Sequence, residues 1–201
     1  LNAATLLLIL IEFGWPTLVY RGIASNDRPL THQTRMARAL GHVLLLTGLL
    51  WAVSWLLVDK FASAQWQAVM VCMGAVAVMN LVSAHMRGAG RFGLEAVWQS
   101  AGRISSALAI VLAVYWFEPL TTSWIFSSWA AGLLIMIALF ARQWLTRPSW
   151  AGIWQDYPSL LPFVLIAAMY TWLLKGDMVL LDVGNPKEAS MYAACSRIAE
   201  A

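Results

Sequence analysis

The chain has 201 residues, of which 61% are hydrophobic and only 11% are charged, and its formal net charge is +3. A soluble domain of this length needs more charged residues to cover its surface, and a nucleic-acid binder gathers Lys and Arg on a solvated face. The composition argues against both classes. Because lipid satisfies no backbone polar groups, long apolar segments must be helices that close their own hydrogen bonds. We therefore predict an all-α, polytopic membrane protein.

Six apolar segments reach the length of about 20 residues that a helix needs to cross the hydrocarbon core. They occupy residues 3–20, 41–58, 65–85, 93–117, 123–142 and 159–181, and a seventh span begins near Ala189. Both ends of the chain lie in apolar sequence. We expect an interior fragment of a longer protein.

Arginines gather in every second gap between these segments. The first, third and fifth gaps contain, in order, Arg21, Arg28, Arg35 and Arg38, then Arg87 and Arg91, then Arg142 and Arg147. The other gaps pair Lys60 with Asp59 and Lys187 with Glu188, or contain Glu118 without a basic residue. Basic loops are retained on the cytoplasmic side, so this alternation predicts a multi-pass protein of the inner (cytoplasmic) membrane with its arginine-rich gaps inside.

The segment 93–117 has a polar stripe on one helical face, formed by Glu95, Gln99, Arg103 and Ser106. Arg103 lies roughly 15 Å along the helix from Gly93, which places it near the middle of the bilayer. Glu95 is two turns away, so it cannot neutralise Arg103 within the same helix. Arg103 therefore needs an anion from another helix or from a ligand, and the sequence leaves both open.

Other spans also contain charged residues, which are costly in lipid and usually face a protein interior or a wet cavity. Glu12 precedes Gly14 and Pro16, which permit bending; it either binds a coupling proton or cation or pairs with a basic residue across the bundle. Lys175 and Asp177 point to different faces of their helix.

Two further patterns lie at the edges of spans. Asn80, Ser83 and Arg87 form a weaker polar stripe along 65–85 that reaches the cytoplasmic edge. Pro158 and Pro162 open the sixth span, where they either loosen its first turn or, for Pro158, simply start the helix.

Motifs of enzymes and metal sites are missing from the sequence. There is no CxxC or HExxH spacing, P-loop, GxSxG elbow or Gly-rich dinucleotide turn. Cys72 and Cys195 lie in apolar stretches and read as small lipophilic residues, not as a disulfide. We expect no catalytic activity, no cofactor, no metal and no nucleic-acid partner.

Three stretches resemble a known family. The run 87–95 (RGAGRFGLE), the run from Asp177 through 185–192 to Arg197, and the segment from Glu12 to Arg21 are similar to parts of polysaccharide-biosynthesis flippases. These belong to the multidrug/oligosaccharidyl-lipid/polysaccharide exporter superfamily. A departure is Ser190, where the family usually has Gly. The resemblance implies a two-lobed exporter, with residues 1–145 as helices two to six of the N-terminal lobe, 146–158 as an inter-lobe linker, and 159–201 as the start of the C-terminal lobe.

The family resemblance also implies a function. That function is translocation of undecaprenyl-diphosphate-linked oligosaccharide repeat units across the inner membrane by alternating access, for assembly of O-antigen, capsule or exopolysaccharide. Partners would be the lipid-linked oligosaccharide, membrane lipids, a coupling proton or Na⁺, and other polysaccharide-assembly proteins. The substrate-binding candidates in the cavity are Arg103, Lys175, Gln99, Glu95 and Arg197. The coupling-ion candidates are Glu12 and Asp177.

Three other readings stay open. A cation-coupled drug antiporter of the same superfamily would use carboxylates in its cavity, for which Glu12 and Asp177 are candidates, although the basic Arg103 argues against it. A membrane-embedded glycan polymerase or acyltransferase would need a large external loop with several Arg or a His/Asp pair, and this sequence has none. A structural membrane scaffold is the simplest alternative.

Overall fold

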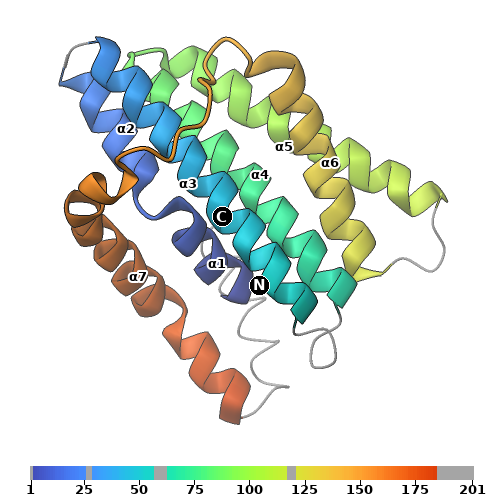
Figure 1. Ribbon diagram of the computed structural model, residues 1–201. Coiled ribbons are helices and arrows are strands. Elements are labelled where there is room, and N and C mark those ends of the chain that lie inside the picture. Colours follow the sequence, from blue (N-terminus) through green and yellow to red (C-terminus); the bar gives the residue numbers. More distant parts are fainter. Residues whose placement is uncertain (1, 26–28, 57–62, 117–120, 185–201) are drawn as a thin grey trace.

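The computed structural model of the protein describes residues 2–25, 29–56, 63–116 and 121–184, with backbone only at 2–3, 29–31, 56, 63 and 172–184. Within these ranges the chain is all helical, which confirms the predicted fold class. The helices are α1 (Asn2–Glu12), α2 (Trp15–Ala24), α3 (Pro29–Leu56), α4 (Ser63–Gly88), α5 (Phe92–Trp116), α6 (Thr122–Phe140) and α7 (Ile153–Gly184) (Figure 1).

The described residues contain four helices that are long and apolar enough to cross a membrane, at His32–Trp55, Ala64–Gly88, Phe92–Trp116 and Thr122–Phe140. A fifth span is present if α1 and α2 are taken together, since they pass the same test as a pair bent by 44°. The protein is therefore a helical membrane protein, and its described residues contain fewer qualifying spans than the six predicted. The sixth predicted span, 159–181, is helical within α7 but is not among the qualifying helices, and the seventh lies outside the described residues.

The second predicted span begins too late, because α3 starts at Pro29 and not at residue 41. The extension contains Arg35 and Arg38, so hydropathy alone does not detect it. Met36 and Leu40 on its inner face are buried at helical spacing, and this burial stabilises the helix beyond the apolar stretch.

The start of α7 also differs from the prediction. The helix begins at Ile153, within the segment taken as an inter-lobe linker, and both Pro158 and Pro162 lie inside it. Pro158 is therefore not a helix start. Buried Ile153 and Leu160 anchor this first part of α7 to the rest of the protein.

The span predicted at 3–20 is broken. Phe13 has φ 42° and Gly14 has φ 75°, both left-handed, and Pro16 occupies the first turn of the new helix, where a missing N–H costs nothing. A Cβ on Gly14 would lie 3.0 Å from the Cβ of Phe163 in α7. The break, expected from Gly14 and Pro16, is thus also a place of close contact with α7.

Helix α4 is the centre of the bundle. In its apolar stretch 72% of the residues are buried, against 39% in α3 and 22% in both α5 and α6. It packs against α1, α2 and α3 on one side and against α5 and α6 on the other (Figure 1). Small residues permit this close packing: a Cβ on Gly74, for example, would lie 2.8 Å from the side chain of Thr47 in α3.

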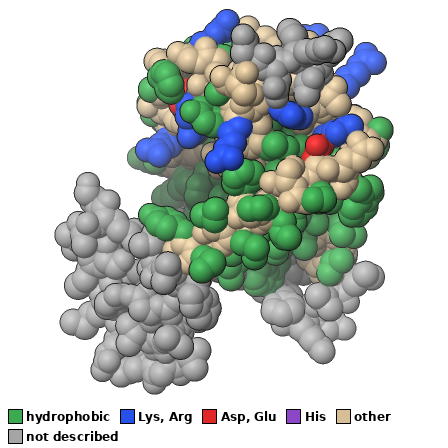
Figure 2. Space-filling view, turned by 90° about the vertical axis from the view of Figure 1, so that its left-hand side faces the viewer, with side chains coloured by type: hydrophobic (Ala, Val, Ile, Leu, Met, Phe, Trp, Pro, Cys, Tyr) green, Lys and Arg blue, Asp and Glu red, His purple; other side chains and the backbone are tan. Residues whose placement is uncertain are grey.

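The described basic side chains other than Arg103 gather at one end of the molecule. Figure 2 shows Lys and Arg side chains around the upper part and a broad belt of hydrophobic side chains below them. This is the arrangement that the alternating arginine-rich gaps predict. The belt matches the surface that lipid would cover.

Candidate functional site

The two polar stripes predicted on separate helices face each other across α4 and α5. Arg87 on α4 donates from Nε to Glu95 Oε1 on α5 at 3.0 Å, and its Nη2 lies 2.8 Å from the same oxygen. One turn further into the membrane, Gln99 Nε2 donates to Ser83 Oγ at 2.6 Å. We call these two contacts the polar ladder. They hold the antiparallel helices α4 and α5 in one register.

Arg103 lies one turn beyond the polar ladder on α5. It is exposed, and it makes no hydrogen bond or ion pair with any residue that the structure describes. It lines a groove of about 230 Å³ between α4, α5 and α6, which we call the Arg103 groove. The lining residues are Val76, Met79, Asn80, Gln99, Gly102, Arg103, Trp129 and Leu133. A guanidinium without an anion at this depth is costly, so its position points to a ligand or a partner.

Asn80 connects the Arg103 groove to the break between α1 and α2. Its Nδ2 donates to Glu12 Oε1 at 2.5 Å. Glu12 is the last residue of α1, so the carboxylate lies where one half of the broken span ends. Among the described residues Glu12 bonds the amide of Asn80 and forms no ion pair with a basic residue. The predicted alternative of an ion pair between Glu12 and a basic residue therefore finds no partner within the described part of the chain.

The other predicted site residues have different surroundings. Glu95 is occupied by Arg87, and Ser106 is buried and donates to the carbonyl of Gly102 at 2.8 Å. Lys175 and Asp177 lie on the part of α7 described as backbone only, and Arg197 lies outside the described residues. Helix α7 packs against α1 and α2, whereas α5 packs against α4 and α6, so the structure does not bring the helix of Lys175 beside Arg103 (Figure 1).

Sequence reasoning missed a set of contacts between helix α3 and residues 151–157, which comprise the end of the loop before α7 and the first turn of α7. Arg38 donates from Nη1 to Asp156 Oδ2 at 2.9 Å and from Nε to the carbonyl of Ala151 at 3.0 Å. His42 Nδ1 and the Tyr157 hydroxyl share a hydrogen bond of 2.8 Å. We call these contacts the linker clamp. The sequence signal for this contact was Asp156, an acidic residue in a segment whose other charged residues are Arg142 and Arg147.

Aromatic and cationic packing adds to the linker clamp. Phe13, at the break in the first span, lies 5.1 Å from the Tyr157 ring and 5.7 Å from the His42 ring, measured between centroids. The guanidinium of Arg21 lies 4.6 Å from the ring centroid of Phe163. The broken span is therefore in direct contact with the first turns of α7.

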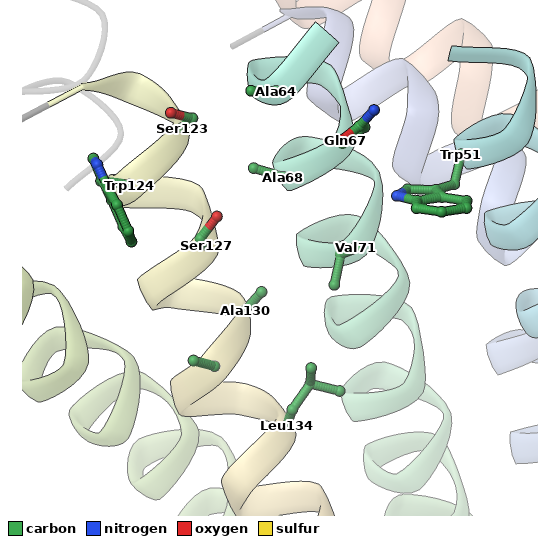
Figure 3. Close-up of a pocket in the computed structure, with 11 residues that line it drawn as sticks. Trp51, Ala64, Gln67, Ala68, Val71, Ser123, Trp124, Ser127, Ala130 and Leu134 are labelled. Carbon is green, nitrogen blue, oxygen red and sulfur yellow. The ribbon is translucent and has the colours of Figure 1, made fainter. Parts of the chain in front are cut away.

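A wider groove of about 450 Å³ lies at the opposite end of the membrane belt, between α4 and α6. Figure 3 shows it between Trp124 and Trp51, with the short side chains of Ala68, Ser127 and Ala130 leaving the space between the helices. None of the described residues that line it is charged. An anion is therefore better matched by the Arg103 groove.

No group of three or more His, Cys, Asp or Glu side chains converges within the described part of the chain. Comparison of the chain with protein-family models, with curated proteins and with solved structures finds no match. The function must therefore be argued from the residues of the site.

Proposed function

We propose that the protein is a flippase that moves undecaprenyl-diphosphate-linked oligosaccharide repeat units across the bacterial inner membrane, by alternating access, for surface-polysaccharide assembly. The observation that supports this most is Arg103, a cation deep in the membrane belt with no anion among the described residues. A diphosphate is the anion that such a substrate carries through the membrane. The resemblance of residues 87–95 to this family points in the same direction.

The Arg103 groove has groups for each part of such a substrate. Arg103 would hold diphosphate oxygens, since guanidinium binds phosphate through paired N–H donors. Asn80 and Gln99 supply amide donors and acceptors for sugar hydroxyls, and the Trp129 ring offers an apolar face. Ile104 and Leu108 on α5 are exposed apolar residues, against which a polyprenyl chain could remain in lipid.

Glu12 is the proposed coupling site of this transporter. The Glu12–Asn80 hydrogen bond joins a carboxylate at a broken span to a residue that lines the Arg103 groove. In transporters, the C-terminal ends of half-helices and the unwound carbonyls of broken spans bind coupling ions, and Glu12 lies at such an end. A proton or Na⁺ at Glu12 would change its bond to Asn80 and so reach the substrate groove. Asp177 remains a second coupling candidate, and the same Glu12 carboxylate favours the drug antiporter as the rival function.

The experiment uses the full-length gene, deleted from a bacterium that exports a surface glycan. The deletion strain is complemented with wild type, Arg103→Gln, Arg103→Lys, and Arg91→Gln as a control that removes an exposed arginine outside the groove. Surface polysaccharide, the leaflet of lipid-linked repeat units, and protein abundance are measured together.

We expect Arg103→Gln to lower export by about 10- to 100-fold, the equivalent of one charge-assisted hydrogen bond, with repeat units accumulating in the inner leaflet. Arg103→Lys should keep part of the activity, and Arg91→Gln should export as wild type. Normal export by Arg103→Gln at normal abundance would overturn the proposal. Unchanged glycan with altered resistance to cationic drugs would favour the antiporter.

A further inference from the structure

A third groove lies at the arginine-rich end of the molecule, where α6 ends and the chain turns toward α7. It has a volume of about 420 Å³, and we call it the α6-end groove. Its lining residues are Ile137, Ala138, Arg142, Leu145, Thr146, Arg147 and Pro148. It shares no residue with the Arg103 groove.

The α6-end groove combines two cations with a buried hydroxyl. Arg142 and Arg147 are exposed and form no hydrogen bond or ion pair with the described residues. The Oγ1 atom of Thr146 is buried and has no hydrogen-bond partner within the described part of the chain, although buried hydroxyls nearly always find one. Two guanidinium groups and a free hydroxyl donor together suit an anion with several oxygen acceptors, such as a phosphate ester.

The surroundings of the groove are apolar and face lipid. Ile137, Ala138 and Leu145 form its apolar wall. Leu139 and Phe140, the last two residues of α6, are 67% and 55% exposed, so the surface beside the groove is one that acyl chains would cover. The arginines follow directly after the membrane-spanning stretch, at the level of the phospholipid headgroups.

We propose that the α6-end groove binds an anionic phospholipid. Arg142 and Arg147 contact the oxygens of its phosphate, Thr146 donates a hydrogen bond to the same group, and an acyl chain lies along Ile137 and the exposed end of α6. The lipid in this site is structural, so the proposal does not depend on what the protein transports. Basic side chains near a membrane attract anionic lipid in general, but an enclosed hydroxyl makes this site selective for a phosphate that enters the groove.

The test measures phosphatidylglycerol bound to the purified full-length protein by native mass spectrometry, after exchange from nanodiscs of phosphatidylcholine containing a graded fraction of phosphatidylglycerol. Variants are Arg142→Gln, Arg147→Gln and Thr146→Val. Thr146→Ser serves as the conservative variant that keeps the hydroxyl. Arg91→Gln is the matched control, because it removes the same charge from the same end of the molecule, outside the groove.

We expect each arginine variant to weaken retention of phosphatidylglycerol about tenfold and Thr146→Val to weaken it severalfold, as for the loss of one hydrogen bond. Thr146→Ser and Arg91→Gln should bind as wild type. An equal loss in Arg91→Gln, or normal binding by Thr146→Val, would reduce the effect to surface attraction and overturn the proposal. Displacement of the lipid by inorganic phosphate or glycerol phosphate at millimolar concentration would overturn it in favour of a soluble anion.

Discussion

The packing of α6 against α5 depends on the absence of a side chain at Gly132. A Cβ at this position would lie 2.7 Å from the carbonyl oxygen of Ser105 and 2.7 Å from the Cα of Ser106, whereas ordinary contact begins at 3.4 Å. Both neighbours are backbone atoms, so no side chain can rotate away. Gly132→Ala must therefore separate the two helices by several tenths of an ångström. The hydrogen bond from Ser105 Oγ to the Gly132 carbonyl, 2.8 Å long, would lengthen with them.

The expected cost follows from these contacts. Overpacking a close contact costs about 1–3 kcal/mol, and a weakened hydrogen bond adds about 0.5–1.5 kcal/mol. Replacing a glycine within a helix by alanine returns about 1 kcal/mol. We expect Gly132→Ala to lower the free energy of unfolding by about 1–3 kcal/mol. Since the adjacent Leu133 lines the Arg103 groove, the displacement should also widen that groove.

The assay is reversible unfolding of the protein in mixed detergent micelles, followed by circular dichroism. Gly48→Ala is the matched control, because Gly48 also lies within a membrane helix but a Cβ there meets no atom within 4 Å. The control should be neutral or up to about 1 kcal/mol more stable. If Gly132→Ala were as stable as Gly48→Ala, the close approach of α5 and α6 would be wrong.

Two further predictions concern the linker clamp and the adjacent contact of α3 with Ser149. In a double-mutant cycle, Arg38→Ala and Asp156→Ala should be non-additive, with a coupling of about 1 kcal/mol in the free energy of unfolding. This value is near the upper end for such pairs because the two side chains are only 20% and 18% exposed. Strict additivity would rule out the pair. Gly41→Ala should speed hydrogen exchange of residues 146–152, because its Cβ would overlap the carbonyl oxygen of Ser149. Unchanged exchange there would contradict the contact.

Patterns local in the sequence predicted the all-helical class and which residues of each polar stripe share one face of a helix, but not all helix boundaries. The spacing of Glu95 and Gln99 placed them on one face of a helix, and the stripe with Ser83 and Arg87 was visible in the same way. What spacing could not show is that these two faces meet, because helix rotation depends on packing across the bundle. Gly90, at φ 71° in the short turn between α4 and α5, helps return the chain so that both stripes pair.

No local pattern in the sequence predicts the contacts of the linker clamp. Arg38 and Asp156 are 118 positions apart, and no periodicity connects residues at that distance. The same limit applies to Arg103, because its lack of a partner among the described residues depends on how α4, α5 and α6 pack together. The extension of α3 was missed for a different reason, because the burial of Met36 and Leu40 outweighs the polar residues between them.

The central position of α4 divides the helices into two packing groups. The hairpin of α5 and α6 packs on α4 and within itself, whereas α1, α2 and α3 pack on the other side of α4 and receive α7. A small rotation of the hairpin about α4 would change the distance between Arg103 and Asn80 without loosening the contacts of Arg38 or His42. The contacts of the α5–α6 hairpin and the contacts that receive α7 thus lie on opposite sides of α4.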